Sequence, residues 1–158
     1  MVDSQPVLRQ GIVVTLLNQE NVEVVGEASS ATEASRMARS LVPDVIVMEL
    51  CRPSRGGPET MGWVRNLVPL PNVLVYGASD SQEDLLVAMR VGARGYVLKS
   101  AGATEFARAV SHVAEGSIVF SPRVATKLLD KLTASWEANS ALTRREAQVF
   151  ALAETGQN

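Results

Sequence analysis

The run Val45-Ile46-Val47-Met48-Glu49 decides the fold of this chain. Four apolar residues in a row, rich in β-branched side chains and closed by an acidic one, are typical of a strand buried on both faces. Such strands occur in parallel sheets that helices cover on both sides. We therefore predict a strand over Asp44–Met48 at the centre of an α/β domain.

Similar runs alternate with helical patterns along the chain. Apolar residues recur at helical spacing between the runs, and Ser81 with Asp84 forms a near capping box at the start of one helix. This alternation predicts a doubly wound parallel sheet with right-handed crossovers. Further strands are predicted over Val22–Gly26, Asn72–Tyr76 and Gly95–Leu98, and helices over Pro6–Asn18, Ala31–Leu41, Pro58–Leu67, Ser81–Val91 and Ala103–Glu115.

The pattern changes after Gly116. Ser121-Pro122 opens another helix, with serine at the cap and proline in the first turn. Thr133–Ala141 is polar and small and is interpreted as a linker, and a last helix follows over Arg144–Glu154. We predict a domain over 1–116, an extra helix and linker over 117–141, and the start of a second domain over 142–158.

Composition sets only broad limits. The 158 residues are 46% hydrophobic and 20% charged, as in a soluble globular protein. The net charge of −2 gives no general reason to expect a nucleic-acid or membrane surface, and no run is long enough to cross a membrane. One cysteine excludes an internal disulfide and fits a cytoplasmic setting.

Four strings of the chain together resemble a known family. They are Val2-Asp3-Ser4-Gln5-Pro6, Val22-Glu23-Val24-Val25-Gly26, Gly92-Ala93-Arg94-Gly95-Tyr96-Val97-Leu98-Lys99 and Leu142-Thr143-Arg144-Arg145-Glu146. In this order they resemble NarL/FixJ-type response regulators: a receiver domain, a linker and the opening of a LuxR-type helix-turn-helix. The resemblance implies a flavodoxin-like sheet of order 2-1-3-4-5, with a site where the strand order reverses. It also implies a cytoplasmic prokaryotic transcription regulator that binds DNA through a complete C-terminal domain and pairs as a homodimer or with a related regulator.

Against this pattern, both ends of the chain are expected to be incomplete. Met1-Val2-Asp3 matches only the last residues of the central first strand. Its absence would leave backbone groups of two neighbouring strands unpaired, at about 1–3 kcal/mol for each buried group. We expect either another segment in that place or a natural start upstream of Met1. Asn158 falls where the DNA-reading helices should follow, so this chain alone is not expected to read DNA.

The resemblance also locates a phosphoacceptor pocket, and this chain departs from it at several positions. Glu49 stands in the place of the family's phosphorylated aspartate, and Ser4 replaces one acid of the pair that begins with Asp3. Gly77 replaces a threonine or serine, while Lys99 matches. Phosphoryl transfer to a carboxylate needs an acceptor, acids that hold Mg²⁺, a hydroxyl that meets the phosphate and a lysine that neutralises it.

The longer arm of Glu49 changes the expected chemistry of this pocket. One added C–C bond, about 1.5 Å, should bring its carboxylate to Lys99 and give an ion pair that mimics the charge of a phosphorylated site. Asp3 and Glu49 remain a weak possibility as Mg²⁺ ligands, and no cofactor is expected. We interpret the receiver as independent of aspartyl phosphorylation, so control by a histidine kinase is doubtful, although a purely structural ion pair is the alternative.

Other residues have a functional and a plainer interpretation. Tyr96 stands at the family's switch aromatic, or is only packed in a strand. Cys51 could sense redox state but fits an inert loop thiol, and His112 fits a solvated position on a helix. Arg144 and Arg145 could contact the DNA backbone or form a solvated face.

Four functions therefore remain open at this point. The first is an atypical DNA-binding regulator whose input is a ligand, a partner or its own abundance, and the second is a conventional phosphorelay receiver. The third is a flavodoxin-like enzyme or small-molecule binder. Against it, the chain lacks a glycine-rich phosphate loop, and it has only one histidine for a catalytic set. The fourth is a stand-alone interaction module. We expect a regulator rather than an enzyme.

Overall fold

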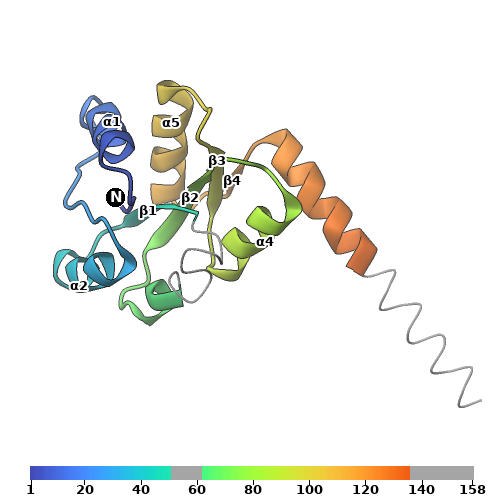
Figure 1. The fold of residues 1–158 in the computed structure, drawn as a ribbon, viewed down its shortest axis with the longest axis horizontal. Helices are drawn as coiled ribbons and strands as arrows, with labels where there is room; N and C mark the ends of the chain where they lie inside the picture. The colour runs from blue at the N-terminus through green and yellow to red at the C-terminus, as the bar shows by residue number, and fades with distance from the viewer. Residues whose placement is uncertain (51–61, 136–158) are drawn as a thin grey trace, which may run out of the picture. The chain divides into compact units, whose positions relative to one another are not determined.

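The computed structural model describes residues 1–50 and 62–135, and its centre is a parallel sheet. The strands are β1 (Val45–Glu49), β2 (Asn72–Gly77), β3 (Gly95–Leu98) and β4 (Val119–Phe120), in the order β1-β2-β3-β4 (Figure 1). Strand β1 pairs with β2 from Val45 opposite Asn72 to Glu49 opposite Tyr76. The predicted parallel, doubly wound α/β fold is confirmed.

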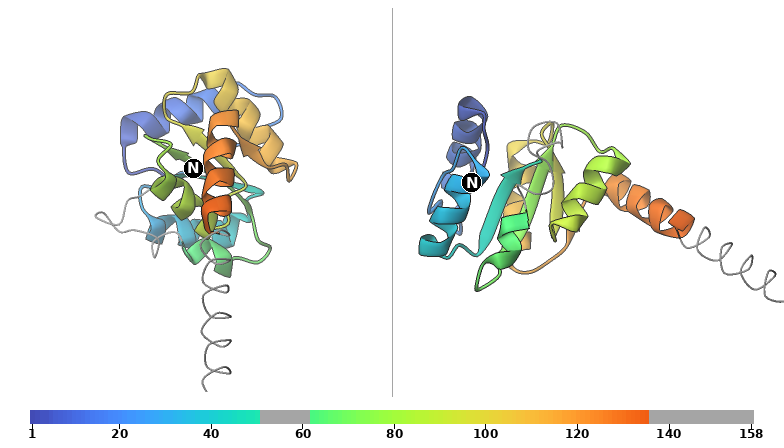
Figure 2. Two further views of the ribbon diagram at one scale, coloured as in Figure 1. Left: turned by 90° about the vertical axis from the view of Figure 1, so that its right-hand side faces the viewer. Right: turned by 60° about the horizontal axis from the view of Figure 1, so that its bottom comes forward.

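Helices cover both faces of this sheet. Helices α1 (Pro6–Leu17) and α5 (Ala103–Ala114) lie on one face, and α2 (Ala31–Leu41), the short 3-10 helix η2 (Gly62–Asn66) and α4 (Gln82–Arg90) lie on the other (Figures 1 and 2). Ser81 caps α4 as predicted, because its Oγ accepts a hydrogen bond of 3.2 Å from the amide of Asp84. Gly92, with φ of 79°, provides the left-handed turn after that helix.

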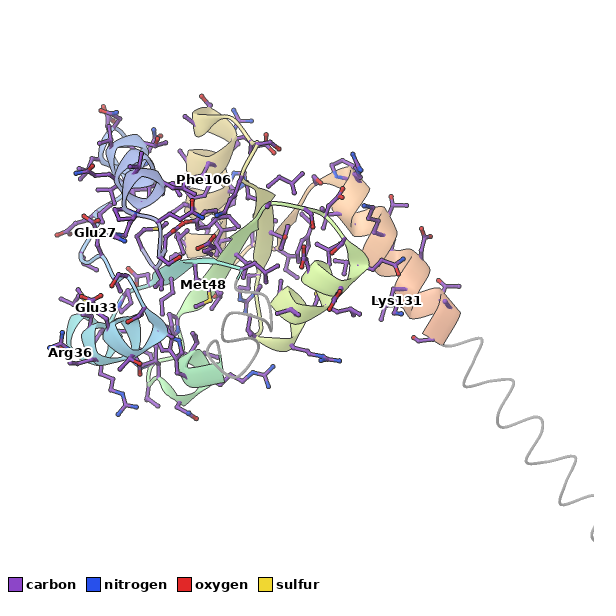
Figure 3. All side chains as sticks on the ribbon, viewed as in Figure 1. Glu27, Glu33, Arg36, Met48, Phe106 and Lys131 are labelled. Carbon is purple, nitrogen blue, oxygen red and sulfur yellow. The ribbon has the colours of Figure 1, made fainter. Side chains whose placement is uncertain are left out.

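A hydrophobic core lies between the sheet and α5. Tyr76 of β2 is 1% exposed, and its ring meets that of Phe106 edge-on, with centroids 6.0 Å apart. Around this pair the buried residues come from α1, α5 and three strands: Leu16, Val47, Leu74, Val97, Ala109, Val110 and Val113. The charged side chains Glu33 and Arg36 of α2 point away from this core (Figure 3). This packing holds the carboxyl ends of β1, β2 and β3 at one edge.

The prediction of a strand over Val22–Gly26 is wrong. These residues pair in no sheet, although their exposure alternates residue by residue as it does along a strand. Within the described residues, Val2 forms isolated bridges to Ala28 on one side and to Met48 on the other, and Met1 is hydrogen-bonded to Gly26 and Ala28, so the segment has no continuous strand beside it. Within residues 1–50 and 62–135, the sheet on this side of β1 continues only as these isolated bridges at Val2.

The end of the described chain differs from prediction in two details. Val119–Phe120 forms the short strand β4 beside β3, where the sequence showed only a brief apolar stretch. The following helix covers 122–135 and begins as predicted, with Ser121 Oγ accepting from the amide of Val124 at 3.3 Å. This helix therefore continues through 133–135, which had been assigned to the linker. Two compact units are distinguished, Met1–Val124 and Ala125–Asn158.

Candidate functional site

All five predicted pocket residues meet at the carboxyl edge of the sheet. Glu49 ends β1, Gly77 ends β2, and Lys99 directly follows β3, where its amide donates to the carbonyl of Gly77 at 2.8 Å. Ser4 joins them because Val2 anchors the amino end of the chain beside β1, with hydrogen bonds from Val2 N to Val47 O and from Glu49 N to Val2 O. Asp3 completes the group from between Val2 and Ser4.

The glutamate and the lysine form an ion pair. Lys99 Nζ contacts Glu49 Oε1, and both side chains are largely buried, with exposed fractions of 19% and 14%. Two neutral side chains also donate hydrogen bonds to the Glu49 carboxylate: Ser4 Oγ lies 3.3 Å from Oε2, and the side-chain amide of Gln5 lies 3.3 Å from Oε1. The Lys99 ammonium also lies 5.3 Å from the centre of the Tyr76 ring. The ion pair expected from the longer side chain is therefore present in the structure.

Asp3 lies beneath this pair and is 1% exposed. The amide of Gln5 donates to its Oδ1 at 2.5 Å, and the hydroxyl of Tyr76 donates to its Oδ2. Burial raises the pKa of the Asp3 carboxyl above its ordinary value, and the negative charge of Glu49 adds to this, while the Gln5 amide and Lys99 act in the opposite direction.

Gly77 leaves room that Tyr96 fills. A Cβ placed on Gly77 would overlap the Tyr96 hydroxyl and lie 2.9 Å from its Cζ. The Tyr96 side chain is turned inward, 2% exposed, and its hydroxyl donates to the carbonyl of Ser79 at 2.6 Å. A residue larger than glycine at 77 is therefore incompatible with this position of Tyr96.

The loop after β2 connects Tyr96 to the start of the last described helix. Ser79, whose carbonyl holds Tyr96, donates its hydroxyl to Asp84 of α4. The next residue, Asp80, forms an ion pair with Arg123 at 2.6 Å. These contacts link Tyr96, through Ser79 and its neighbour Asp80, to Arg123.

Two members of the site were missed by the sequence analysis. Tyr76 donates to Asp3 from the middle of a buried strand, where a tyrosine carries no signal beyond packing. Gln5, the residue before α1, donates hydrogen bonds to both Asp3 and Glu49. Its position directly after Asp3 and Ser4 in the sequence was the one signal that could have identified it.

The arrangement fits an internal ion pair better than a divalent cation. Mg²⁺ prefers an octahedral set of oxygens with carboxylates free to coordinate it. Here Lys99 occupies one oxygen of Glu49, and both oxygens of Asp3 accept hydrogen bonds. Within residues 1–50 and 62–135 no group of three or more histidine, cysteine, aspartate or glutamate side chains is placed to hold a metal ion.

The remaining candidate residues lie away from this pocket or beyond the described ranges. His112 is exposed on the last turn of α5. Cys51, Arg144 and Arg145 lie outside the described residues. None of the described helices is both long and apolar enough to cross a membrane.

Comparison with known proteins gives the family. Residues 1–111 match the response regulator receiver domain. The chain belongs to the response regulators. The nitrate/nitrite response regulator NarL of Escherichia coli is 33% identical over 146 residues, which cover 92% of this chain and 66% of that protein. The response regulator VraR of Staphylococcus aureus is 32% identical over 155 residues, 98% of this chain and 74% of that protein.

Solved structures agree with this assignment. A two-component response regulator of the LuxR family from Aurantimonas superposes with a TM-score of 0.73 at 30% identity, covering 84% of this receiver chain and 94% of the other. RcsB, whose dimers have been solved bound to DNA, shares the fold with a TM-score of 0.70 at 24% identity, over 84% of this chain and 66% of that one. The NarL-type resemblance and the flavodoxin-like fold are confirmed, and the relatives are named as regulators rather than enzymes.

Proposed function

We propose that this receiver belongs to a transcription regulator whose state is not set by aspartyl phosphorylation. The observation that carries the proposal is the buried ion pair of Glu49 and Lys99. A phosphoryl acceptor must present a free carboxylate oxygen to the incoming phosphorus, and the lysine must be free to neutralise the transferred group. In this receiver, Glu49 and Lys99 already neutralise each other in an ion pair.

The surroundings of the ion pair support the same function. Ser4 and Gln5 donate to Glu49 as hydrogen-bond donors to a phosphoryl group would, so the carboxylate is satisfied without one. No hydroxyl is available at Gly77, and the Tyr96 hydroxyl fills that volume. We propose that Tyr96 is held inward without any phosphoryl group, and that the input is a ligand, a partner or the abundance of the protein.

The proposed output is DNA binding by paired copies. The segment from Leu142 resembles the opening of a LuxR-type helix-turn-helix, in which Arg144 and Arg145 would contact phosphates. Because DNA recognition of this kind needs the whole domain, we propose it for a chain in which that domain is complete. In such a chain, replacing both arginines by alanine should weaken binding to all sequences equally and reduce the salt slope by about two. Fluorescence anisotropy at several salt concentrations measures both quantities, and loss of sequence preference instead would contradict a backbone role.

Phosphoryl transfer is tested by weighing the intact protein. The receiver is incubated with acetyl phosphate and Mg²⁺, and no gain of a phosphoryl group is expected. The matched variant carries Ser4→Asp, Glu49→Asp and Gly77→Thr together, which restores an acid pair, a shorter acceptor and a hydroxyl. We expect phosphorylation of this variant, lost again on Lys99→Ala. A stable phosphoryl group on Glu49 of the unmodified receiver would support a conventional phosphorelay instead.

A further inference from the structure

The helices on one face of the sheet all end at the same edge of it. Helices α2, η2 and α4 each lead through a short connection into the start of the next strand, which is β1, β2 or β3 respectively. Because these strands are parallel neighbours, their starting ends and the three connections lie along one edge of the sheet, the amino edge. The Glu49 pocket lies at the opposite, carboxyl edge.

Arginines gather at the amino edge, although the whole chain has a net charge of −2. The three segments that form the edge, 36–42, 62–71 and 86–94, contain no aspartate or glutamate. Their arginines are all exposed: Arg36, Arg39, Arg65, Arg90 and Arg94. Among residues 1–50 and 62–135, none of these five side chains forms an ion pair. The edge therefore carries positive charge that is free to meet an acidic partner.

A small groove lies beside these arginines. It has a volume of ≈ 120 Å³ and lies between the end of α2 and the connection that leads into β2. The side chains that line it are aliphatic or proline, apart from Arg39 and Asn66. The groove therefore has room for one aliphatic side chain, placed next to a cation.

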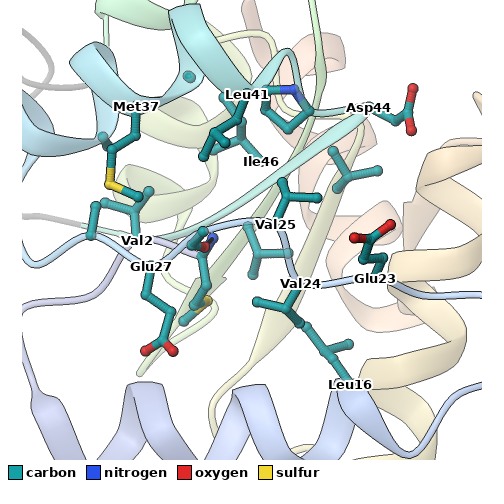
Figure 4. A pocket seen from close by; sticks show the side chains of 18 of the residues that line it. Val2, Leu16, Glu23, Val24, Val25, Glu27, Met37, Leu41, Asp44 and Ile46 are labelled. Atoms are coloured by element: carbon teal, nitrogen blue, oxygen red, sulfur yellow. Dashed lines mark hydrogen bonds between the residues drawn. The ribbon is translucent and has the colours of Figure 1, made fainter.

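Aliphatic side chains at this groove face solvent. Val68 is 94% exposed, Leu70 is 66% exposed and Val42 is 50% exposed. Leu41 differs from them, because its side chain lies beside that of Ile46 in the larger cavity next to β1 (Figure 4). Val42 also has φ of 47°, which is uncommon for a β-branched residue, and strained residues of this kind cluster at binding sites. Exposed apolar side chains with charged neighbours are typical of a surface that binds another protein.

We propose that the amino edge is a docking surface for an acidic segment of a partner protein. One aliphatic side chain of that segment fills the groove, and its carboxylates meet Arg39, Arg65 and Arg90. Opposite charge selects the acidic partner and steers it to this surface. A flat lipid surface does not fill a groove, and a nucleic acid has no aliphatic side chain to place in one. The surface lies at the other edge of the sheet from Glu49, so the proposal does not depend on phosphate independence.

The probe is the fluorescein-labelled peptide Glu-Asp-Leu-Leu-Glu-Asp-Leu-Glu, added to the 158-residue chain. Fluorescence anisotropy should show saturable binding that weakens as ionic strength rises, because salt screens exposed charges. In the ¹⁵N-labelled chain, the amide resonances of Arg39, Val42 and Val68 should shift, and that of Glu49 should not. The same peptide with serine in place of every leucine should bind at least about ten-fold more weakly, because nothing then fills the groove.

Two matched pairs of variants separate this surface from others. Arg39→Glu should weaken binding at least about ten-fold, whereas Arg108→Glu, which reverses an exposed arginine on α5, should leave it unchanged. Val68→Ser should weaken binding about five-fold, whereas Val7→Ser, at a position 85% exposed on α1, should leave it unchanged. All four side chains are exposed, so the variants should fold, and circular dichroism checks this. The resonance shifts of the unmodified chain need no variant.

Several results would overturn the proposal. These are the absence of saturable binding, equal effects of the two variants within either pair, or shifts confined to other surfaces. Tighter binding to phosphatidylglycerol vesicles than to the peptide, lost in Arg39→Glu, would show that the surface binds lipid headgroups instead. Tighter binding to duplex DNA would assign the surface to nucleic acid. A dimer detected by analytical ultracentrifugation and lost in Arg39→Glu would show that a second copy occupies it.

Discussion

Replacing Gly77 by alanine should force Tyr96 out of its buried position. The added Cβ would overlap the Tyr96 hydroxyl, and the carbonyl of Ser79 would lose its donor. Overpacking of a core costs about 1–3 kcal/mol, and loss of a hydrogen bond costs about 1 kcal/mol more. We therefore expect Gly77→Ala to lower the free energy of unfolding by about 2–4 kcal/mol. The measurement is urea denaturation with linear extrapolation.

A matched glycine and a double-mutant cycle isolate the cause. Gly11 lies in α1 with nothing within 4 Å of its would-be Cβ, so Gly11→Ala should stabilise the protein by up to ~1 kcal/mol through helix propensity. Tyr96→Leu removes the hydroxyl and Cζ, so Gly77→Ala should cost at least about 1 kcal/mol less in that background. If the two changes add within about 0.5 kcal/mol, Gly77 and Tyr96 are not coupled and the reasoning fails.

Three further perturbations probe the rest of the receiver. Glu49→Gln should lower the free energy of unfolding by about 1–3 kcal/mol in urea denaturation, because Lys99 stays largely buried without its counter-charge. The double variant Glu49→Gln with Lys99→Met should recover part of that loss. A larger loss in the double variant would contradict the role of the ion pair. Because the pKa of Asp3 is raised in the folded protein, the native state holds that proton to higher pH than the unfolded chain, so stability should fall as pH rises from about 3.8 through the raised value. Asp3→Asn should remove that part of the slope in urea midpoints measured against pH, and an unchanged slope would exclude Asp3 as its source. Ser81→Ala should cost about 1 kcal/mol through loss of the α4 cap, whereas Ser40→Ala, an exposed serine within α2, should change little.

Sequence patterns predicted those parts of the fold that have local causes. The strand Val45–Glu49 could be predicted because a continuous run of β-branched and apolar residues is typical of a strand buried on both faces. Val22–Gly26 is also rich in valine and still forms no strand, because hydrogen-bonded pairing depends on a neighbouring strand that composition does not report. The two-residue strand Val119–Phe120 is too short to show any periodicity.

The site was predictable to a similar extent. Glu49 and Lys99 were expected to pair because the added methylene has a definite length, and the structure contains that pair. Gly77 and Tyr96 were each identified, yet only coordinates show that the tyrosine occupies the volume the glycine leaves. The hydrogen bond from Tyr76 to Asp3 joins residues 73 positions apart, beyond the reach of any local pattern.

The central claim is that an internal ion pair replaces phosphate in this receiver. Its most direct test is a titration of the ¹⁵N-labelled protein with Mg²⁺ and then beryllofluoride, a phosphoryl analogue, followed at the backbone amides of Glu49, Tyr96 and Lys99. With Lys99 held by Glu49, these resonances should not shift beyond those of exposed residues such as His112. Saturable shifts at the three amides would show that the pocket still accepts a metal and a phosphoryl group, and would contradict the account.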